Sequence, residues 1–233
     1  MMKVNIPKRI TNETTLDILR GLRRAGSLVP PPVSSRIIKD HLEDNIKAFN
    51  AHRKKITEDG GYIENQNDYS DMYYGTRTVR FSGCEIIASY NVLHALTGRE
   101  PSFSKMIAAF EKNGMIFYGN LGTDPGKMRS FLKKQGFKVE EFTDINAYRK
   151  SREGERPVRK GKEEAFVLTL YNDRTDLMKG IHTVAVTKKE RWYFLHNDGG
   201  TRARGPFAGI EQVLDHYERI GARMISVLRV TKI

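Results

Sequence analysis

The stretch SGCEIIASYNVLHALTG, residues 82–98, decides the fold expected for this chain. Its apolar residues cover most of the circumference of a helix, and a helix that is apolar nearly all round is a buried one. Gly83 permits a tight approach turn and Gly98 suits a left-handed C-terminal cap, so we expect the helix to begin at Cys84. The sequence therefore predicts a central buried helix against which the rest of the chain packs.

Cys84 is the only cysteine of the chain and lies in the first turn of this expected helix. The unpaired N–H groups and the positive end of the helix dipole favour a thiolate there, which predicts a lowered thiol pKa. The alternative is a buried thiol that only fills space, as free cysteines commonly do. A single cysteine excludes an intramolecular disulfide framework and a cysteine-rich zinc site.

A length of 233 residues suits one large domain, or one domain with an extension. We expect an N-terminal helical extension at residues 1–66, with helices near 14–24 and 36–56 separated by Pro30–Pro32, and a main domain at 67–233. The extension is either an appendage packed on the main domain or a pro-segment or docking arm. No signal-peptide or membrane-spanning run is visible, so we expect a cytoplasmic protein without a membrane partner.

The net charge of +12 is spread along the chain rather than gathered in one patch. Its densest cluster, residues 149–162, is interrupted by Glu153 and Glu155 and is expected to be a charged surface loop. No helix-turn-helix, RNP-like or zinc-finger signature is present, so we do not expect nucleic-acid binding. The positive charge instead favours an acidic partner or substrate.

The second half of the chain changes from helical to alternating periodicity. A helix is expected near 207–219, and four strands are expected to pair in an antiparallel sheet: 165–171, 182–188, 191–197 and 224–230. The first half adds expected helices at 102–112 and 125–135 and strands at 137–142 and, more briefly, 76–81. Helices first and an antiparallel sheet later are typical of the α+β class, with the Cys84 helix packed on the sheet.

The expected hairpin brings two polar side chains together. A tight turn centred between residues 189 and 190 places His182 and Asn197 opposite each other on neighbouring strands. An amide oxygen in that position can accept the imidazole N–H, fix the tautomer and orient the ring. If the ring faces the Cys84 thiol, the three residues form a Cys–His–Asn nucleophilic arrangement.

Four segments, in this order, resemble the papain-like cysteine peptidases, most closely the bacterial branch that cleaves leader peptides after a double glycine. They are GCEIIASYN at 83–91, GTDP at 122–125, GIHTVAV at 180–186 and YFLHN at 193–197. The resemblance extends over roughly residues 76–230 and includes the order of the elements. It implies a papain-like fold in which the helix that carries the cysteine packs on the C-terminal sheet.

The resemblance also implies residue roles. Cys84 would be the nucleophile, His182 the general base and acid, and Asn197 the residue that orients the imidazole. In the leader-peptidase branch the third residue is usually Asp, so the adjacent Asp198 is the alternative. Because neighbouring strand residues point to opposite faces, only one of the two is expected to serve.

One position departs from the family pattern. These peptidases usually carry a Gln about six residues before the cysteine as an oxyanion donor, and this chain has Thr78 there. Gln66, Asn67 and Ser82 are the candidate substitutes, and the backbone N–H of Cys84 would be the second donor.

These observations predict a cysteine peptidase that cleaves a peptide or protein through a thioester intermediate. The alternatives are a thiol acyltransferase or amidase on the same fold, and a papain-like binding module without turnover. No cofactor is expected. No metal is expected either, because His41, His52 and His216 lack metal-ligand spacing with carboxylates and His94 reads as a satisfied core residue.

Overall fold

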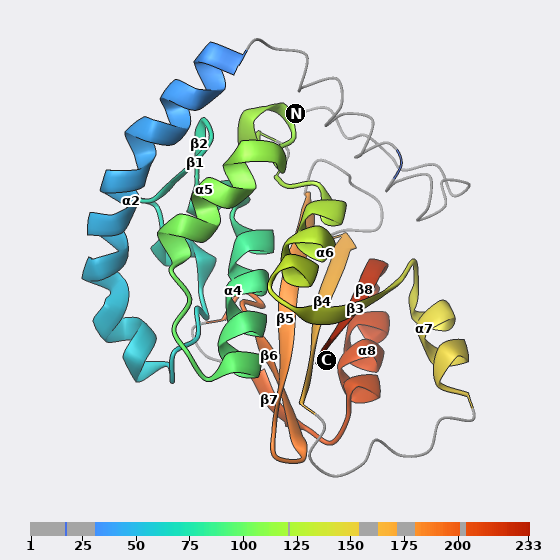
Figure 1. Cartoon of the computed structure of the whole chain (residues 1–233). Coiled ribbons are helices and arrows are strands. Elements are labelled where there is room, and N and C mark those ends of the chain that lie inside the picture. The colour runs from blue at the N-terminus through green and yellow to red at the C-terminus, as the bar shows by residue number, and fades with distance from the viewer. Residues whose placement is uncertain (1–16, 18–30, 121, 154–162, 172–179, 201–203) are drawn as a thin grey trace.

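The computed structural model describes residue 17 and residues 31–120, 122–153, 163–171, 180–200 and 204–233. These residues form a mixture of helices and antiparallel sheet, which confirms the predicted α+β class (Figure 1). The helix expected at 14–24 lies outside the described residues except for Asp17. None of the described helices is long and apolar enough to cross a membrane.

The larger sheet of the described residues is antiparallel, with strand order β3-β8-β4-β5-β6-β7. The four strands predicted to pair are its central ones: β8 (Arg223–Lys232), β4 (Glu164–Tyr171), β5 (Ile181–Lys189) and β6 (Trp192–His196). The edges are β3 (Phe137–Phe142), predicted as a strand, and β7 (Arg204–Phe207), which the sequence did not predict.

The helix that carries the cysteine, α4 (Cys84–Thr97), packs on one face of this sheet. Gly98 adopts φ 67° and caps the helix in the left-handed conformation that glycine adopts without strain. Ile86 and Ile87 of α4 share a core with Val167 and Ala185 of the sheet. The prediction of a buried helix from Cys84 to Gly98 is therefore confirmed.

Two shorter helices, α5 (Phe103–Asn113) and α6 (Pro125–Lys134), join the same core as α4. Asp124 caps α6 by accepting the backbone N–H of Gly126 at 3.0 Å, and Pro125 fills the first helical position, as its sequence predicts. This cap fixes the loop at 122–124, which lies against the start of α4.

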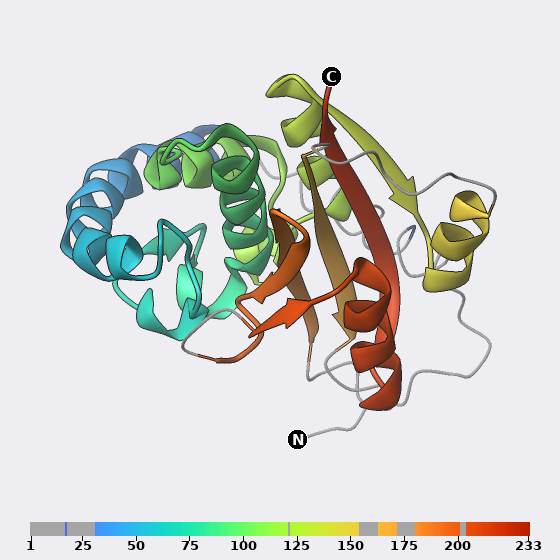
Figure 2. The same ribbon diagram turned by 90° about the horizontal axis from the view of Figure 1, so that it is seen from below.

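The opposite face of the sheet is covered by α7 (Ile145–Arg152) and α8 (Ile210–Arg219). Figure 2 shows the sheet edge-on, with α4 (green) on one side and α7 (yellow) and α8 (red) on the other. The loop expected at 149–162 is partly helical, because α7 extends to Arg152; residues 154–162 lie outside the described part. The helix expected from 207 begins only at Ile210, after β7.

The N-terminal half is built on α2 (Pro31–Glu58), which is longer than the helix expected at 36–56. It begins within the proline run because the first turn of a helix needs no N–H donors. Phe49 and Ile56 of α2 share the core of α4. Asn45 holds β1 (Tyr73–Tyr74) by accepting from the N–H of Tyr73 at 2.7 Å and donating to its carbonyl at 2.8 Å.

The chain from α2 to α4 contains short elements: η1 (Gln66–Asp68), β1, β2 (Arg77–Thr78) and α3 (Val79–Ser82). The strand expected at 76–81 is therefore wrong beyond Thr78. The backbone turns there into α3, and Val79 packs its side chain into the α4 core.

Candidate functional site

Cys84 is the first residue of α4, as predicted, but its thiol is buried. The residue is 5% exposed, and Sγ donates a hydrogen bond to Oε2 of Glu85 at 3.2 Å. The backbone N–H of Thr183, in β5, also lies against the sulfur. The start of α4 therefore meets the sheet beside the residue that follows His182.

The expected lowering of the thiol pKa is wrong. Burial, followed by the charge of Glu85 and the hydrogen bond to it, raises the pKa of Cys84 well above its ordinary value. The N–H groups of Thr183 and Glu85 oppose this rise, but they are smaller influences than burial. The helix start alone therefore does not produce a thiolate, and the resting group is a protonated thiol.

Glu85 is the functional residue that the sequence analysis missed. Burial raises the pKa of this carboxyl to about 7, so its charge changes near neutral pH. Its position was the available signal, since Glu85 is the one carboxylate between Cys84 and Gly98, in a helix predicted to be buried. A buried carboxyl in hydrogen-bond contact with a thiol controls how readily that thiol ionises.

The GTDP segment at 122–125 lies against this pair. The backbone of Thr123 hydrogen-bonds the Glu85 carboxyl, and a Cβ added at Gly122 would come within 3.2 Å of Oε1. The hydroxyl of Thr123 in turn lies 2.7 Å from that of Tyr74. The segment named by the resemblance thus lies beside the Glu85 carboxyl that accepts the hydrogen bond of the thiol.

His182 is held by a backbone group. Its Nε2 lies 2.7 Å from the carbonyl oxygen of Asn197. A carbonyl can only accept, so Nε2 carries the proton and Nδ1 keeps the lone pair. Burial lowers the pKa of His182, while the bond to Asn197 and the charge of Asp198 oppose the fall. The ring is therefore neutral at pH 7 and Nδ1 can act as a base.

The predicted register between His182 and Asn197 is wrong. The β5–β6 pairing runs from Ala185 with His196 to Lys189 with Trp192, so the turn is centred one residue later than expected. Glu190 takes a positive φ of 57° in this turn. Pairing has ended before His182 is reached, and Asn197 bends out of the strand with φ 60° to bring its carbonyl to the ring.

The side chain of Asn197 does not orient the imidazole. Its Oδ1 accepts the backbone N–H of Gln66 at 2.8 Å, and its Nδ2 donates to Gln66 Oε1 at 3.4 Å. The alternative residue, Asp198, influences His182 through its charge. Its carboxylate accepts from Tyr217 at 2.7 Å and pairs with Arg204 at 3.1 Å. Strand alternation does not separate the two candidates, because β6 ends at His196.

No hydrogen bond of the described chain joins Cys84 to His182. Ala185 belongs to the core on the α4 side and Val184 to the core on the α8 side. Alternation then places the Thr183 side chain on the α4 face and that of His182 on the other. The thiol meets the backbone of β5 where β6 no longer covers its edge.

The thiol has little access to solvent, because Cys84 is 5% exposed. A pocket of the described residues lies at the β3–β8 edge of the sheet, separated from β5 by β4. Its lining consists of Arg129, Val139, Glu140, Glu141, Phe142, Ser151 and Arg229. It therefore does not serve the candidate site.

The oxyanion candidates have different surroundings. Nε2 of Gln66 donates to the carbonyl of Arg80 at 2.9 Å, and Asn67 is exposed on η1. Ser82 is buried, and its hydroxyl has no hydrogen-bond partner among the described residues. Of the three, Ser82 alone combines burial next to Cys84 with a donor that the described chain leaves unused.

The remaining histidines are engaged within the described chain. His94 lies within 3.1 Å of the Arg99 carbonyl and 3.0 Å of the Gly60 carbonyl. His52 pairs with Asp71 at 2.9 Å. The described residues contain no group of three or more His, Cys, Asp or Glu side chains arranged to hold a metal ion.

Comparison with models of protein families finds no match to this chain, and comparison with curated proteins finds none either.

Proposed function

We propose that the chain is a thiol hydrolase of papain-like architecture that cleaves peptide bonds, with Cys84 as nucleophile and His182 as general base. The observation that carries the proposal is the state of His182: its Nε2 is held by the Asn197 carbonyl, so a neutral ring keeps Nδ1 available. The next residue, Thr183, touches the thiol at the start of a buried helix.

In the proposed reaction, Nδ1 of His182 takes the proton of the thiol and Sγ attacks the substrate carbonyl. The imidazolium then protonates the leaving amine, and a thioester remains on Cys84. Water, deprotonated by the same ring, hydrolyses the thioester. The N–H of Cys84 and the hydroxyl of Ser82 are the proposed donors to the oxyanion.

The proposal requires Nδ1 to come within hydrogen-bond reach of Sγ in the substrate complex. Alternation sets the ring and the thiol on opposite faces of β5, so the ring must turn around the strand edge that β6 leaves uncovered when substrate binds. The thiol must also leave the carboxyl of Glu85, its present acceptor at 3.2 Å. Catalysis therefore begins with a change of hydrogen-bond partner at the sulfur.

Peptide cleavage tests this function. A mixture of unmodified peptides is incubated with the wild type, Cys84→Ala and His182→Ala, and the products are identified by mass spectrometry. We expect new peptide termini only with the wild type, while thermal unfolding shows that both variants are folded. Cleavage that persists in Cys84→Ala would refute the proposed nucleophile.

A second candidate is a papain-like binding module without turnover. The observation that favours it is the buried Cys84 thiol, whose hydrogen bond to Glu85 keeps it protonated. This candidate predicts that peptides bind the wild type and Cys84→Ala equally and emerge uncleaved from both, which the same incubation detects.

A further inference from the structure

Residues 62–66 lie between the two halves of the candidate site, and we call them the bridging segment. The segment follows α2 and ends at Gln66, the first residue of η1. Its Ile63 is fixed to α4 by one side chain: Asn91 Oδ1 accepts the Ile63 N–H at 2.9 Å, and Asn91 Nδ2 donates to the Ile63 carbonyl at 2.9 Å. The segment is therefore fastened to the helix that begins at Cys84.

The next contact of the bridging segment is with the end of β6. Glu64 Oε1 lies 2.7 Å from Nδ1 of His196, and both residues are buried. Nε2 of His196 lies 2.7 Å from the hydroxyl of Thr187, and the Tyr62 ring stacks on the imidazole with centroids 4.2 Å apart. Both nitrogens and one face of His196 are thus held.

The third contact reaches Asn197 itself. The backbone N–H of Gln66 donates to Asn197 Oδ1 at 2.8 Å, and Gln66 Nε2 donates to the carbonyl of Arg80 at 2.9 Å. Arg80 lies in α3, four residues before Cys84. Gln66 therefore connects the residue that anchors His182 to the turn that leads into the nucleophile helix.

These contacts follow one another along the chain. Glu64 is hydrogen-bonded to the side chain of His196, and the Gln66 N–H donates to the side chain of Asn197. The carbonyl of Asn197 is in turn the partner of His182 Nε2. Asn197 holds a positive φ of 60°, a left-handed conformation that asparagine adopts more readily than most non-glycine residues, and the Gln66 N–H fixes its side chain there. The backbone geometry that presents its carbonyl thus depends on contacts from the bridging segment.

We propose that the bridging segment is a positioning element that sets the tautomer and direction of the His182 ring relative to α4. Glu64 and His196 act as positioning residues through Asn197, and they do not touch the reacting atoms. The inference rests on the proposed function, because it assigns His182 as the base. What it adds is a claim about the tautomer of the His182 ring, which can be measured without turnover.

The test is the ring state of His182 observed by NMR with ¹⁵N-labelled histidine, assigned by the signal missing in His182→Gln. In the wild type we expect the Nε2–H tautomer and a lowered pKa. In Glu64→Leu, which removes the hydrogen bond to His196, we expect both tautomers and a pKa lowered further, because the bond to the Asn197 carbonyl opposes the effect of burial. Glu64→Gln keeps a hydrogen-bonding side chain of the same shape and should restore most of the wild-type signal.

A second pair of variants tests the same point where Glu64→Leu is too unstable to study. Asn197→Gly keeps a positive φ without strain but removes Oδ1, whereas Asn197→Asp retains an acceptor for the Gln66 N–H. We expect mixed tautomers in the glycine variant and the Nε2–H tautomer in the aspartate variant. Arg53→Ala, which removes an exposed pair with Glu100, is the control outside the segment.

Unchanged His182 signals in a folded Glu64→Leu or Asn197→Gly variant would overturn the inference. The outcome is separate from that of the cleavage experiment. If the wild type cleaves no peptide while the tautomer still shifts in the variants, the proposed function fails and the positioning role stands. If the wild type cleaves and the tautomer does not shift, the function stands and the inference fails.

Discussion

Cys84 and Glu85 are neighbours in sequence that set each other's ionisation. The carboxylate disfavours the thiolate, and the raised thiol pKa follows from that charge and from burial. Because the pKa of Glu85 is about 7, this inhibition is strongest above neutral pH. The residue next to Cys84 therefore disfavours ionisation of its thiol, an effect that the helix-start position alone does not predict.

Substitution of Glu85 by glutamine tests this restraint. Glu85→Gln removes the negative charge, so the pKa of Cys84 should fall and more thiolate should form at pH 8. We expect iodoacetamide to alkylate Cys84 several-fold faster in the variant, as followed by intact-protein mass spectrometry. Glu111→Gln is the matched control, since it alters another buried carboxyl with a pKa raised to about 7.

Slower alkylation in Glu85→Gln than in the wild type would contradict this account. It would mean that the carboxylate assists ionisation by accepting the thiol proton.

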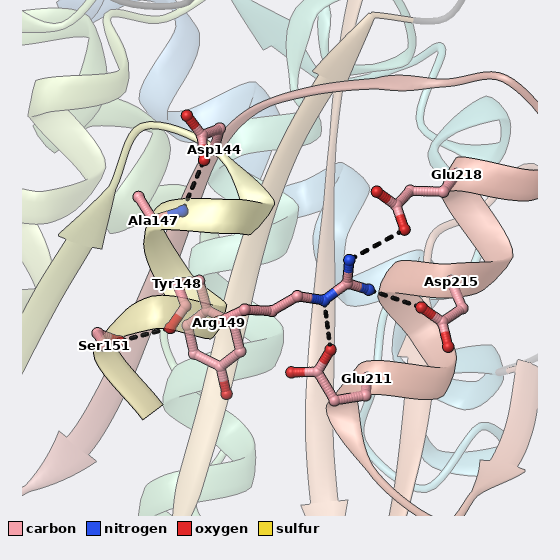
Figure 3. Close-up of polar contacts among 8 residues, drawn as sticks. All are labelled: Asp144, Ala147, Tyr148, Arg149, Ser151, Glu211, Asp215 and Glu218. Carbon is pink, nitrogen blue, oxygen red and sulfur yellow. Dashed lines mark hydrogen bonds and ion pairs between the residues drawn. The ribbon is translucent and has the colours of Figure 1, made fainter. Parts of the chain in front are cut away.

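At the scale of elements, one arginine joins α7 and α8, the two helices on the face of the sheet opposite α4. Arg149 of α7 reaches three carboxylates of α8, with contacts of 2.9 Å to Glu211, 2.6 Å to Asp215 and 3.2 Å to Glu218 (Figure 3). These bonds raise the pKa of Arg149. The carboxylates are spaced so that they share one side of α8, and the guanidinium can serve all three.

Arg149→Ala should destabilise the protein moderately. All four side chains are partly exposed, so water screens the network and we expect a loss of about 1 kcal/mol in the free energy of unfolding. Urea unfolding at low and high salt measures it, and the loss should shrink at high salt. Arg53→Ala, which breaks a single exposed pair, should cost less. An equal loss in the two variants would show that the network adds nothing beyond one pair.

The central strands and α4 could be predicted because their patterns are local. Alternation fixed β4, β5, β6 and β8 to within about two residues, and the apolar circumference with Gly98 fixed α4. The register of the hairpin could not be predicted as well. A shift of the turn by one residue moves every cross-strand partner by two, and this error separated His182 from Asn197 in the pairing.

At the scale of the whole molecule, the candidate site depends on contacts between distant segments. Glu64 meets His196, and Gln66 meets Asn197, across separations of more than a hundred residues. The burial that raises the pKa of Glu85 comes partly from the loop at Gly122. No periodicity or motif encodes such contacts, so Cys84 and His182 could be singled out from the sequence, but their hydrogen-bond partners Glu85 and the Asn197 carbonyl could not.

Buried carboxyls also make stability depend on pH. The pKa values of Glu85 and Glu111 are raised to about 7 from an ordinary value near 4.5, so the folded state binds more protons between these values. Each carboxyl therefore contributes roughly 3 kcal/mol to the free energy of unfolding below pH 4.5, and this contribution is lost as the pH rises through 7.

The Glu111→Gln variant isolates one of these contributions. Urea unfolding at pH 5 and pH 8 should show that the wild type loses more stability over this interval than the variant does. Equal losses in the two proteins would mean that Glu111 is ionised throughout.

The central claim is that His182 activates Cys84, and covalent labelling tests it most directly. The wild type and His182→Ala are treated with an electrophilic peptide-aldehyde or acyl-mimic probe, and the rate of adduct formation at Cys84 in the folded protein is divided by the rate for the same protein unfolded in urea, where the thiol is free of its neighbours. We predict that this ratio falls by ~10² or more in His182→Ala, the usual contribution of a general base. An unchanged ratio would show that the imidazole does not act on the thiol and would contradict the account.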